Sequence, residues 1–303
     1  MYFLMTNDVE LTTTRNVEDP AVAGRLLRDG IPTTLDLYST HDVRATFFFT
    51  GNFVQTCPEA VDLVRSRGHE IGCHAMSHDS RQALDSMGEE EQYALLSRAK
   101  KIVEGPAGPV EAFRAPELRI NRHSVRALER AGFRIDSSVA PQRFDGPLSW
   151  GTRTKLQWMT APRRVYRMAR DDPFAEGDSG VTEVPVSALL VPYMGTSLRI
   201  SPALVGAVGR LLGLQARDVR RPVVFILHPY EFLEETHPPL RGGPGVVEAI
   251  RGRYREELKR RNLGKSAVKL IETMLKGGRR RGFEFVGMSE FLKLSGARGR
   301  GTR

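Results

Sequence analysis

The chain has 303 residues, of which 40% are hydrophobic and 27% are charged, so it can bury a sizeable core and is not generally disordered. Its formal net charge of +9 suits an anionic substrate or a membrane surface, but no basic motif is interleaved with aromatic residues, which argues against nucleic acid. Cys57 and Cys73 form no CxxC motif, which excludes zinc-ribbon sites, thioredoxin-like sites and a disulfide framework.

The opening residues, MYFLMTNDVE, predict a strand rather than a targeting segment. The apolar run is too short for a signal peptide and ends in acidic residues. No run of eighteen apolar residues follows, so no transmembrane segment is expected. We expect a cytoplasmic protein whose basic surface leaves open a peripheral position at a membrane.

Strand-like apolar runs alternate with helical patterns along most of the chain. Strands are expected within 2–8, 44–50, 69–74, 111–116, 133–139, 181–191, 222–228 and 283–288. Helices are expected within 58–68, 88–104 and 121–132. This alternation predicts an α/β domain with a parallel sheet or barrel.

One domain is expected to span residues 1–295, with an excursion at about 140–180 that contains both tryptophans. A Gly/Pro-rich loop and a long basic helix are expected within 236–282, and the sequence EFLEE at 231–235 is typical of a solvated helix start. The basic residues 296–303 are expected to be a disordered tail.

Polar side chains follow several of the predicted strands. In parallel α/β folds the reactive groups gather just past the carboxyl ends of the strands. The candidates at these positions are Asp8, Glu10, His74, His78, Arg114, Asp136 and His228.

The types of these residues favour metal-assisted hydrolysis. Two imidazoles four residues apart, together with a carboxylate, suit zinc and leave a position open for water. A bound metal acidifies water and polarises a carbonyl. A second carboxylate can then act as general base and a distant histidine as general acid.

At these residues the chain resembles the polysaccharide deacetylases of carbohydrate esterase family 4, which have the NodB-homology fold. GHEIGCHAMSH is similar to the family's second motif, FRAP (113–116) to the third, DSSV (136–139) to the fourth and FILHPYEF (225–232) to the fifth. The resemblance covers the chain from residue 3 to about 232 and implies a distorted (β/α)7-type barrel. It also implies that His74 and His78 are metal ligands.

The first motif departs from the family's usual pair of adjacent aspartates. NDVE spaces its acids by one residue, as in a branch of the family with D-x-D or D-x-E. By that likeness Asp8 is the base and Glu10 the third metal ligand, although the two roles could be exchanged. Glu117 stands where an aromatic residue usually follows Pro116, and an acid there suits an amino group on the substrate.

The resemblance implies hydrolysis of an N-acyl, usually N-acetyl, group of an amino sugar in a glycan or a glycan precursor. Asp8 would take a proton from the attacking water, and His228 would protonate the leaving amine. Arg114, with Asp136, would orient Asp8.

The substrate would contact a second set of residues. A backbone N–H near Pro116 would stabilise the oxyanion, Glu117 would face the sugar, and Ile226 would line the pocket for the acyl methyl group.

Several alternatives stay open at this point. The substrate could be a lipid- or nucleotide-linked sugar that is deformylated or deacetylated, or a cyclic amide, and the chain could instead be a catalytically silent sugar-binding homologue. The implied cofactor is one divalent metal, with zinc preferred over cobalt, nickel or manganese. The implied partner is an N-acylated sugar or glycan, which could carry a phosphate or lipid.

Overall fold

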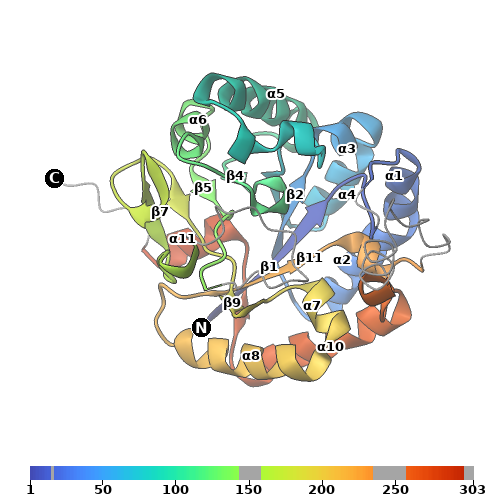
Figure 1. The fold of residues 1–303 in the computed structure, drawn as a ribbon. Helices are drawn as coiled ribbons and strands as arrows, with labels where there is room; N and C mark the ends of the chain where they lie inside the picture. Colours follow the sequence, from blue (N-terminus) through green and yellow to red (C-terminus); the bar gives the residue numbers. More distant parts are fainter. Residues whose placement is uncertain (15–16, 143–157, 235–256, 297–303) are drawn as a thin grey trace, which may run out of the picture.

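The computed structural model describes residues 1–14, 17–142, 158–234 and 257–296. A curled sheet lies at the centre of the molecule, with helices around it (Figure 1). Among the described residues, seven parallel strands follow the order β11-β1-β2-β3-β4-β5-β8. The strands are β1 (Tyr2–Val9), β2 (Ala45–Phe49), β3 (Glu70–Cys73), β4 (Ala112–Phe113), β5 (Ile135–Asp136), β8 (Thr182–Glu183) and β11 (Val223–Leu227). The predicted α/β class with a distorted barrel is confirmed.

Shorter strands extend the sheet at its margins. β12 (Glu284–Phe285) pairs in parallel with the beginning of β1. β6 (Tyr166–Ala169) and β7 (Asp172–Glu176) form an antiparallel hairpin beside β8, and β9 (Ala188–Leu189) and β10 (Val191–Pro192) form a second hairpin. The first hairpin is the described part of the predicted 140–180 excursion.

The sheet closes on itself through a short seam between the segment after β8 and β11. The Ser187 N–H donates to the Val224 carbonyl at 3.2 Å, and the Ser187 hydroxyl accepts from the Val224 N–H at 2.9 Å. After the β9–β10 hairpin, the chain returns to β11 through a parallel bridge between Met194 and Ile226. A side chain thus supplies part of the pairing at this join.

The helices connect the strands and cover the outside of the sheet. The longer ones are α2 (Ile31–Thr40), α4 (Glu59–Ser66), α5 (Glu89–Ala107), α8 (Pro202–Gln215) and α10 (Lys265–Arg280). The shorter ones are α1 (Ala21–Arg25), the π-helical η1 (Leu26–Gly30), α3 (Gly51–Thr56), η2 (Ser80–Gln82), η3 (Leu84–Ser86), η4 (Pro116–Leu118), α6 (Ser124–Arg130), α7 (Gly195–Ile200), η6 (Pro229–Phe232) and α11 (Met288–Leu294). No helix within the described ranges is long and apolar enough to cross a bilayer.

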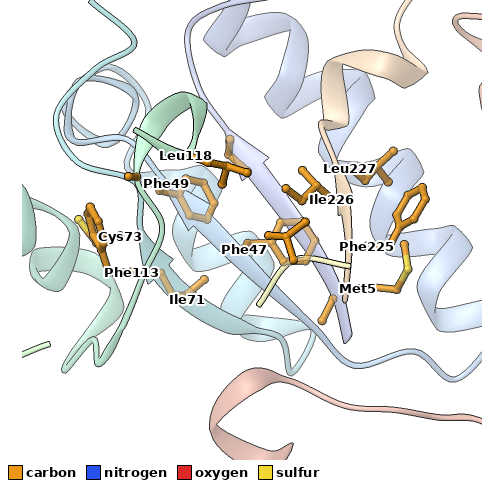
Figure 2. Packing of buried hydrophobic residues seen from close by; sticks show 14 of the residues in the cluster. Met5, Phe47, Phe49, Ile71, Cys73, Phe113, Leu118, Phe225, Ile226 and Leu227 are labelled. Atoms are coloured by element: carbon orange, nitrogen blue, oxygen red, sulfur yellow. The ribbon is translucent and has the colours of Figure 1, made fainter. Parts of the chain in front are cut away.

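Two apolar layers fix the wall of the barrel. Because β2 and β11 are buried along their whole length, both read as continuous apolar runs. Phe47, Phe49 and Phe113 belong to the large cluster that packs between the sheet and the helices (Figure 2). Phe48, one position on, belongs to the second cluster, because side chains alternate between the faces of a strand.

The second cluster fills the interior of the curled sheet. Side chains from β1, β2, β4 and β11 pack against the apolar face of α11. The strand residues are Leu4, Phe48, Ala112 and Val224, and the helix residues are Met288, Phe291 and Leu292. The Met288 N–H donates to the Thr46 hydroxyl near the start of β2, so α11 closes the amino-terminal end of the barrel. The polar side chains lie at the opposite end of the barrel, where the strands terminate.

Some sequence expectations fall only partly on the described residues. Trp158 is 1% exposed and packs in the main cluster, whereas Trp150 lies outside the described residues. The predicted basic helix is present as α10, but residues 235–256 of the predicted loop lie outside the description. So do residues 297–303 of the predicted tail.

Candidate functional site

The polar residues predicted from the strand ends gather at the carboxyl end of the barrel. Asp8 is near the end of β1, His74 follows β3, Arg114 follows β4, and His228 follows β11. Asp8, His74 and Arg114 are 5%, 1% and 0% exposed. The site is therefore enclosed by the barrel wall rather than displayed on a surface loop.

Three of the residues form a group that could hold a metal ion. One ligand atom from each of Glu10, His74 and His78 lies within 4.8 Å of the other two. The Nε2 atoms of the two histidines are 3.3 Å apart, and Glu10 Oε2 is 3.9 Å from His74 Nε2 and in close contact with His78 Nε2. Ligand atoms bonded to tetrahedral zinc at about 2.0–2.1 Å would be separated by roughly 3.3 Å. The donor set and its spacing fit a divalent metal.

The first histidine is oriented by the backbone of the neighbouring strand. His74 Nδ1 is 2.8 Å from the Arg114 carbonyl oxygen, which can only accept, so Nδ1 carries the hydrogen. This tautomer turns the lone pair of Nε2 toward Glu10 and His78. Burial lowers the pKa of His74 to about 4, which keeps the imidazole neutral and ready to ligate.

The second histidine lies on a loop and not on a helix. After β3 the chain turns through Ala75, whose φ is 54°, and the Gly51 N–H of α3 donates to the Ala75 carbonyl. The Glu18 carboxylate then accepts from the His78 N–H at 3.2 Å and from Asn52 at 2.9 Å. The four-residue spacing works because this turn brings His78 back over His74.

The carboxylate of the group is also held from outside. The Thr12 hydroxyl donates to Glu10 Oε1 at 2.7 Å, which leaves Oε2 directed at His78. Burial alone would raise the pKa of Glu10, but the charge of His78 outweighs it and lowers the pKa to about 2. In turn, burial would lower the pKa of His78, and Glu10 outweighs it and raises the pKa. The Glu10–His78 pair therefore holds a proton at the position where a metal would bind.

Asp8 lies beside this group, and one of its carboxylate oxygens is bonded by Arg114. Arg114 Nη1 donates to Asp8 Oδ1 at 2.9 Å and to the Thr6 hydroxyl at 2.8 Å. The second oxygen, Oδ2, is 3.9 Å from His74 Nε2. Burial tends to raise the pKa of Asp8, but the Arg114 charge prevails and lowers it, so the carboxylate is ionised.

The structure gives Arg114 a different second partner from the predicted one. Its Nε and Nη2 donate to the carbonyl and hydroxyl of Ser137, at 3.0 and 2.9 Å. Asp136 instead accepts from the Ser138 hydroxyl and from the Ser137 N–H. Asp136 thus holds the backbone of Ser137, the residue that Arg114 contacts, and the described hydrogen bonds do not join Asp136 to the guanidinium itself.

Asp136 has a buried carboxyl partner that sequence reasoning missed. Glu183 on β8 is 0% exposed, and its Oε1 accepts from the Val139 N–H. One oxygen of each carboxyl, Asp136 Oδ2 and Glu183 Oε2, has no other partner. Burial raises the pKa of Asp136 to about 6, and burial together with the charge of Asp136 raises the pKa of Glu183 well above its ordinary value, so the two groups share a proton.

His228 also has an unforeseen support. Glu231 Oε1 lies 3.2 Å from His228 Nδ1, and Glu231 Oε2 accepts from Arg199 Nε. Glu231 is 0% exposed, which corrects the expectation that the EFLEE segment is a solvated helix start. Burial lowers the pKa of His228, but the hydrogen bond that His228 donates to Glu231 and the charges of Glu10 and Asp8 raise it overall.

The residues predicted to contact substrate lie on two different elements, η4 and β11. Pro116 and Glu117 form η4, where Glu117 and Leu118 both have positive φ values of 53° and 57°. The Glu117 charge contributes to the raised pKa of His78, and its carboxylate lies 3.8 Å from Arg119 Nη1. Ile226 is 2% exposed and packs in the main cluster.

The fold and the site together define an α/β barrel with one possible metal centre at the ends of its strands. The family model for polysaccharide deacetylase matches residues 21–135. A peptidoglycan deacetylase of Helicobacter pylori is 28% identical over 115 residues, 38% of this chain and 39% of that protein. A chitooligosaccharide deacetylase of Azorhizobium caulinodans is 31% identical over 119 residues, 38% of this chain and 55% of that protein.

The fold comparison extends over almost the whole chain. A solved structure from Mycobacterium smegmatis, assigned to the polysaccharide deacetylases, has a TM-score of 0.59 at 22% identity and covers 98% of this chain and 90% of that chain. The chain therefore resembles the polysaccharide deacetylases over residues 21–135, and its fold is the NodB-homology fold.

Two observations show that likeness to these proteins does not by itself establish activity. The alignments span only 39% and 55% of the two named relatives, and the family match includes His74, His78 and Arg114 but not Asp8 or His228. A Bacillus anthracis pseudoenzyme of carbohydrate esterase family 4 also has this fold, with a TM-score of 0.50, 13% identity and coverage of 96% of this chain and 65% of that chain. Catalysis has to be argued from the site itself.

Metal binding should be coupled to the loss of one proton from His78. Since the pKa of His78 is raised, metal affinity should fall about tenfold per pH unit below that pKa, while His74 stays neutral down to about pH 4. Calorimetric titrations with Zn²⁺ in buffers of different ionisation enthalpy would count the protons released. Release of no proton, or of two, would contradict this assignment.

The Asp136–Glu183 pair should make the fold less stable as pH rises. Both folded pKa values exceed those of the unfolded chain, so the folded state holds extra protons that are lost as pH passes through about 6 and above. Glu183→Gln should flatten this decline, with an effect of order 1–3 kcal/mol between about pH 5 and pH 8. Urea unfolding at both pH values measures it. Glu284→Gln, an exposed glutamate on β12, is the control. Parallel profiles for Glu183→Gln and wild type would refute the shared proton.

Proposed function

We propose that the protein is a metal-dependent hydrolase that removes an N-acyl group, most simply N-acetyl, from an amino sugar in a glycan or glycan precursor. The observation that carries this proposal is the convergence of three kinds of group on one space: a possible metal triad, an ionised carboxylate on Arg114, and a histidine with a raised pKa. Sugar binding alone would require neither the carboxylate nor the histidine.

The names of the relatives support the choice of substrate. Two relatives that match this chain are named as deacetylases of peptidoglycan and of chitooligosaccharide, polymers that contain N-acetylated amino sugars. We extend that substrate class to this chain, with phosphate- or lipid-linked precursors as a narrower possibility. We also propose a cytoplasmic location.

The metal would be held by Glu10, His74 and His78, and zinc suits this donor set. When bound, it would polarise the amide carbonyl and acidify water. Asp8 is held by Arg114 and kept ionised, so it can accept a proton from the attacking water. Glu10 Oε2 is in close contact with His78 Nε2, whereas Asp8 is bonded by Arg114, and this difference favours Asp8 as the base and Glu10 as the ligand.

The leaving amine requires a proton donor on the other side of the substrate. His228 fits this role, because its raised pKa keeps it protonated and its Nδ1 is fixed by Glu231. Its Nε2 is then free to donate a proton. Pro116, Glu117 and Ile226 are proposed to contact the substrate, with Asp136 acting on the base indirectly.

The activity should be detected as acetate or formate released from N-acetylglucosamine oligomers and peptidoglycan fragments, assayed with Zn²⁺, Co²⁺, Ni²⁺ and Mn²⁺. Asp8→Asn should lower kcat by about 10²–10⁴ and keep the metal, because it removes only the base. His74→Ala should lose both the metal and turnover.

His123→Ala is the matched control, since His123 precedes α6 and is outside the site. A purified protein that binds no divalent metal, and that none activates, would rule out the proposed mechanism. Metal binding without turnover on any substrate would instead identify a silent homologue.

Glu231 should act as a positioning residue for His228. Glu231→Gln removes the carboxylate that raises the pKa of His228, so the loss of kcat on the alkaline side should shift to lower pH. A purely structural role would lower kcat equally at all pH values. Glu70→Gln, a carboxylate bound by Ser289 at the opposite end of the barrel, should leave the pH profile unchanged.

A further inference from the structure

Helix α8 has apolar side chains on its outward as well as its inward side. Its inward residues, Val205, Val208 and Leu212, are buried. On the outward side, Leu204, Leu211 and Leu214 are 48%, 49% and 58% exposed. The spacing of seven and three residues places these leucines on one face. In Figure 1, α8 lies at the outer edge of the molecule beside α10.

A groove lies along the side of α8 that faces α10. It has a volume of about 390 Å³, and apolar side chains line much of it: Tyr193, Leu198, Val205, Leu270 and Met274. Arg210, Arg280 and Arg281 also line it. A second hollow shares Arg280 and adds Lys276 and Arg279. The exposed leucines and the groove lie on opposite flanks of the outward side of α8, and Arg210, one turn before Leu214, lies between them. We call the leucines, the groove and its cationic margin together the α8–α10 surface.

Part of the cationic charge of this surface has no acidic partner among the described residues, whereas Arg279 is paired with Asp42 at 3.0 Å. In the part of the chain that the structure describes, Arg210 and Arg280 have no ion pair or hydrogen bond. The nearby acid Glu272 is already paired with Lys276 at 2.8 Å. The surface thus presents free guanidinium groups beside exposed leucines.

We propose that the α8–α10 surface docks on an anionic lipid bilayer. Leucines on a helix that lies in the interface enter the boundary between headgroups and acyl chains, and arginines beside them pair with lipid phosphates. A second copy of the chain would bring unpaired arginines against one another, which disfavours a symmetric dimer. Nucleic acid would account for the arginines but would leave the leucines in water.

This proposal does not depend on the proposed hydrolase activity. It concerns the outside of the barrel, and its measurement requires neither metal nor turnover. The full-length chain is used with vesicles of equal parts phosphatidylglycerol and phosphatidylcholine, and with vesicles of phosphatidylcholine alone. Binding should occur on the anionic vesicles and weaken as salt is added, because screening reduces the attraction.

Replacing the three leucines separates this surface from nonspecific attraction. The triple variant Leu204→Ala/Leu211→Ala/Leu214→Ala should lower the partition coefficient by about tenfold or more. Because all three side chains are exposed, the far-UV circular dichroism and the melting temperature should be retained. Leu190→Ala/Leu294→Ala is the matched control, since these leucines are 64% and 54% exposed on other elements.

The charge is tested by Arg210→Gln/Arg280→Gln, which should weaken binding to anionic vesicles and reduce its salt dependence. Equal binding of the leucine triple variant and the control would overturn the proposal. So would equal binding to neutral and anionic vesicles. A wild-type dimer in sedimentation velocity that the triple variant abolishes, without vesicle binding, would assign the surface to self-association instead.

Discussion

The buried guanidinium of Arg114 is the constraint on which the site depends. It donates to Asp8 and Thr6 on β1 and to Ser137 after β5, and it stacks over the Phe48 ring at 4.5 Å. Its own carbonyl oxygen fixes the tautomer of His74. One residue therefore joins the proposed base, a proposed metal ligand and four neighbouring strands. Removing one partner of such a buried ion pair costs about 3–5 kcal/mol, so folding and site geometry are tied together.

Each reactive group has a partner that supplies the opposite charge or removes its own. Arg114 holds Asp8 ionised, Glu231 keeps His228 protonated, and Arg199 holds Glu231. Asp136 and Glu183 form no ion pair with a cation among the described residues. Burial disfavours two negative charges there, and the two carboxyl groups share a proton instead. The carboxyl end of the barrel thus contains ionised and neutral acids a few side chains apart, as acid–base chemistry at one pH requires.

The sequence predicted the strands and the site residues that directly follow them. Each predicted strand run contains an observed strand, since buried parallel strands read as apolar runs and their ends meet at one edge. It did not predict Glu183 or Glu231, because their importance depends on which side chain lies opposite in space. EFLEE has the composition of an exposed helix start, and only the fold places Glu231 between His228 and Arg199. The β6–β7 hairpin was missed because the alternation in β6 covers only four residues, Tyr166–Ala169, within a segment with many arginines and Gly/Pro turns.

The barrel is held together less strongly at the seam at Ser187 than at the pairings of β1 with β2 and β11. β1 is hydrogen-bonded along its length to β2 and β11, whereas the join after β8 depends on a few bonds, one of them made by a serine hydroxyl. Thermal breathing that widens the barrel will therefore begin between β8 and β11, where the least pairing must be broken. Such an opening leaves β1, β2 and β3 together, and with them the spacing of Asp8, Glu10 and His74. The barrel can widen at this seam while the candidate site residues keep their relative positions.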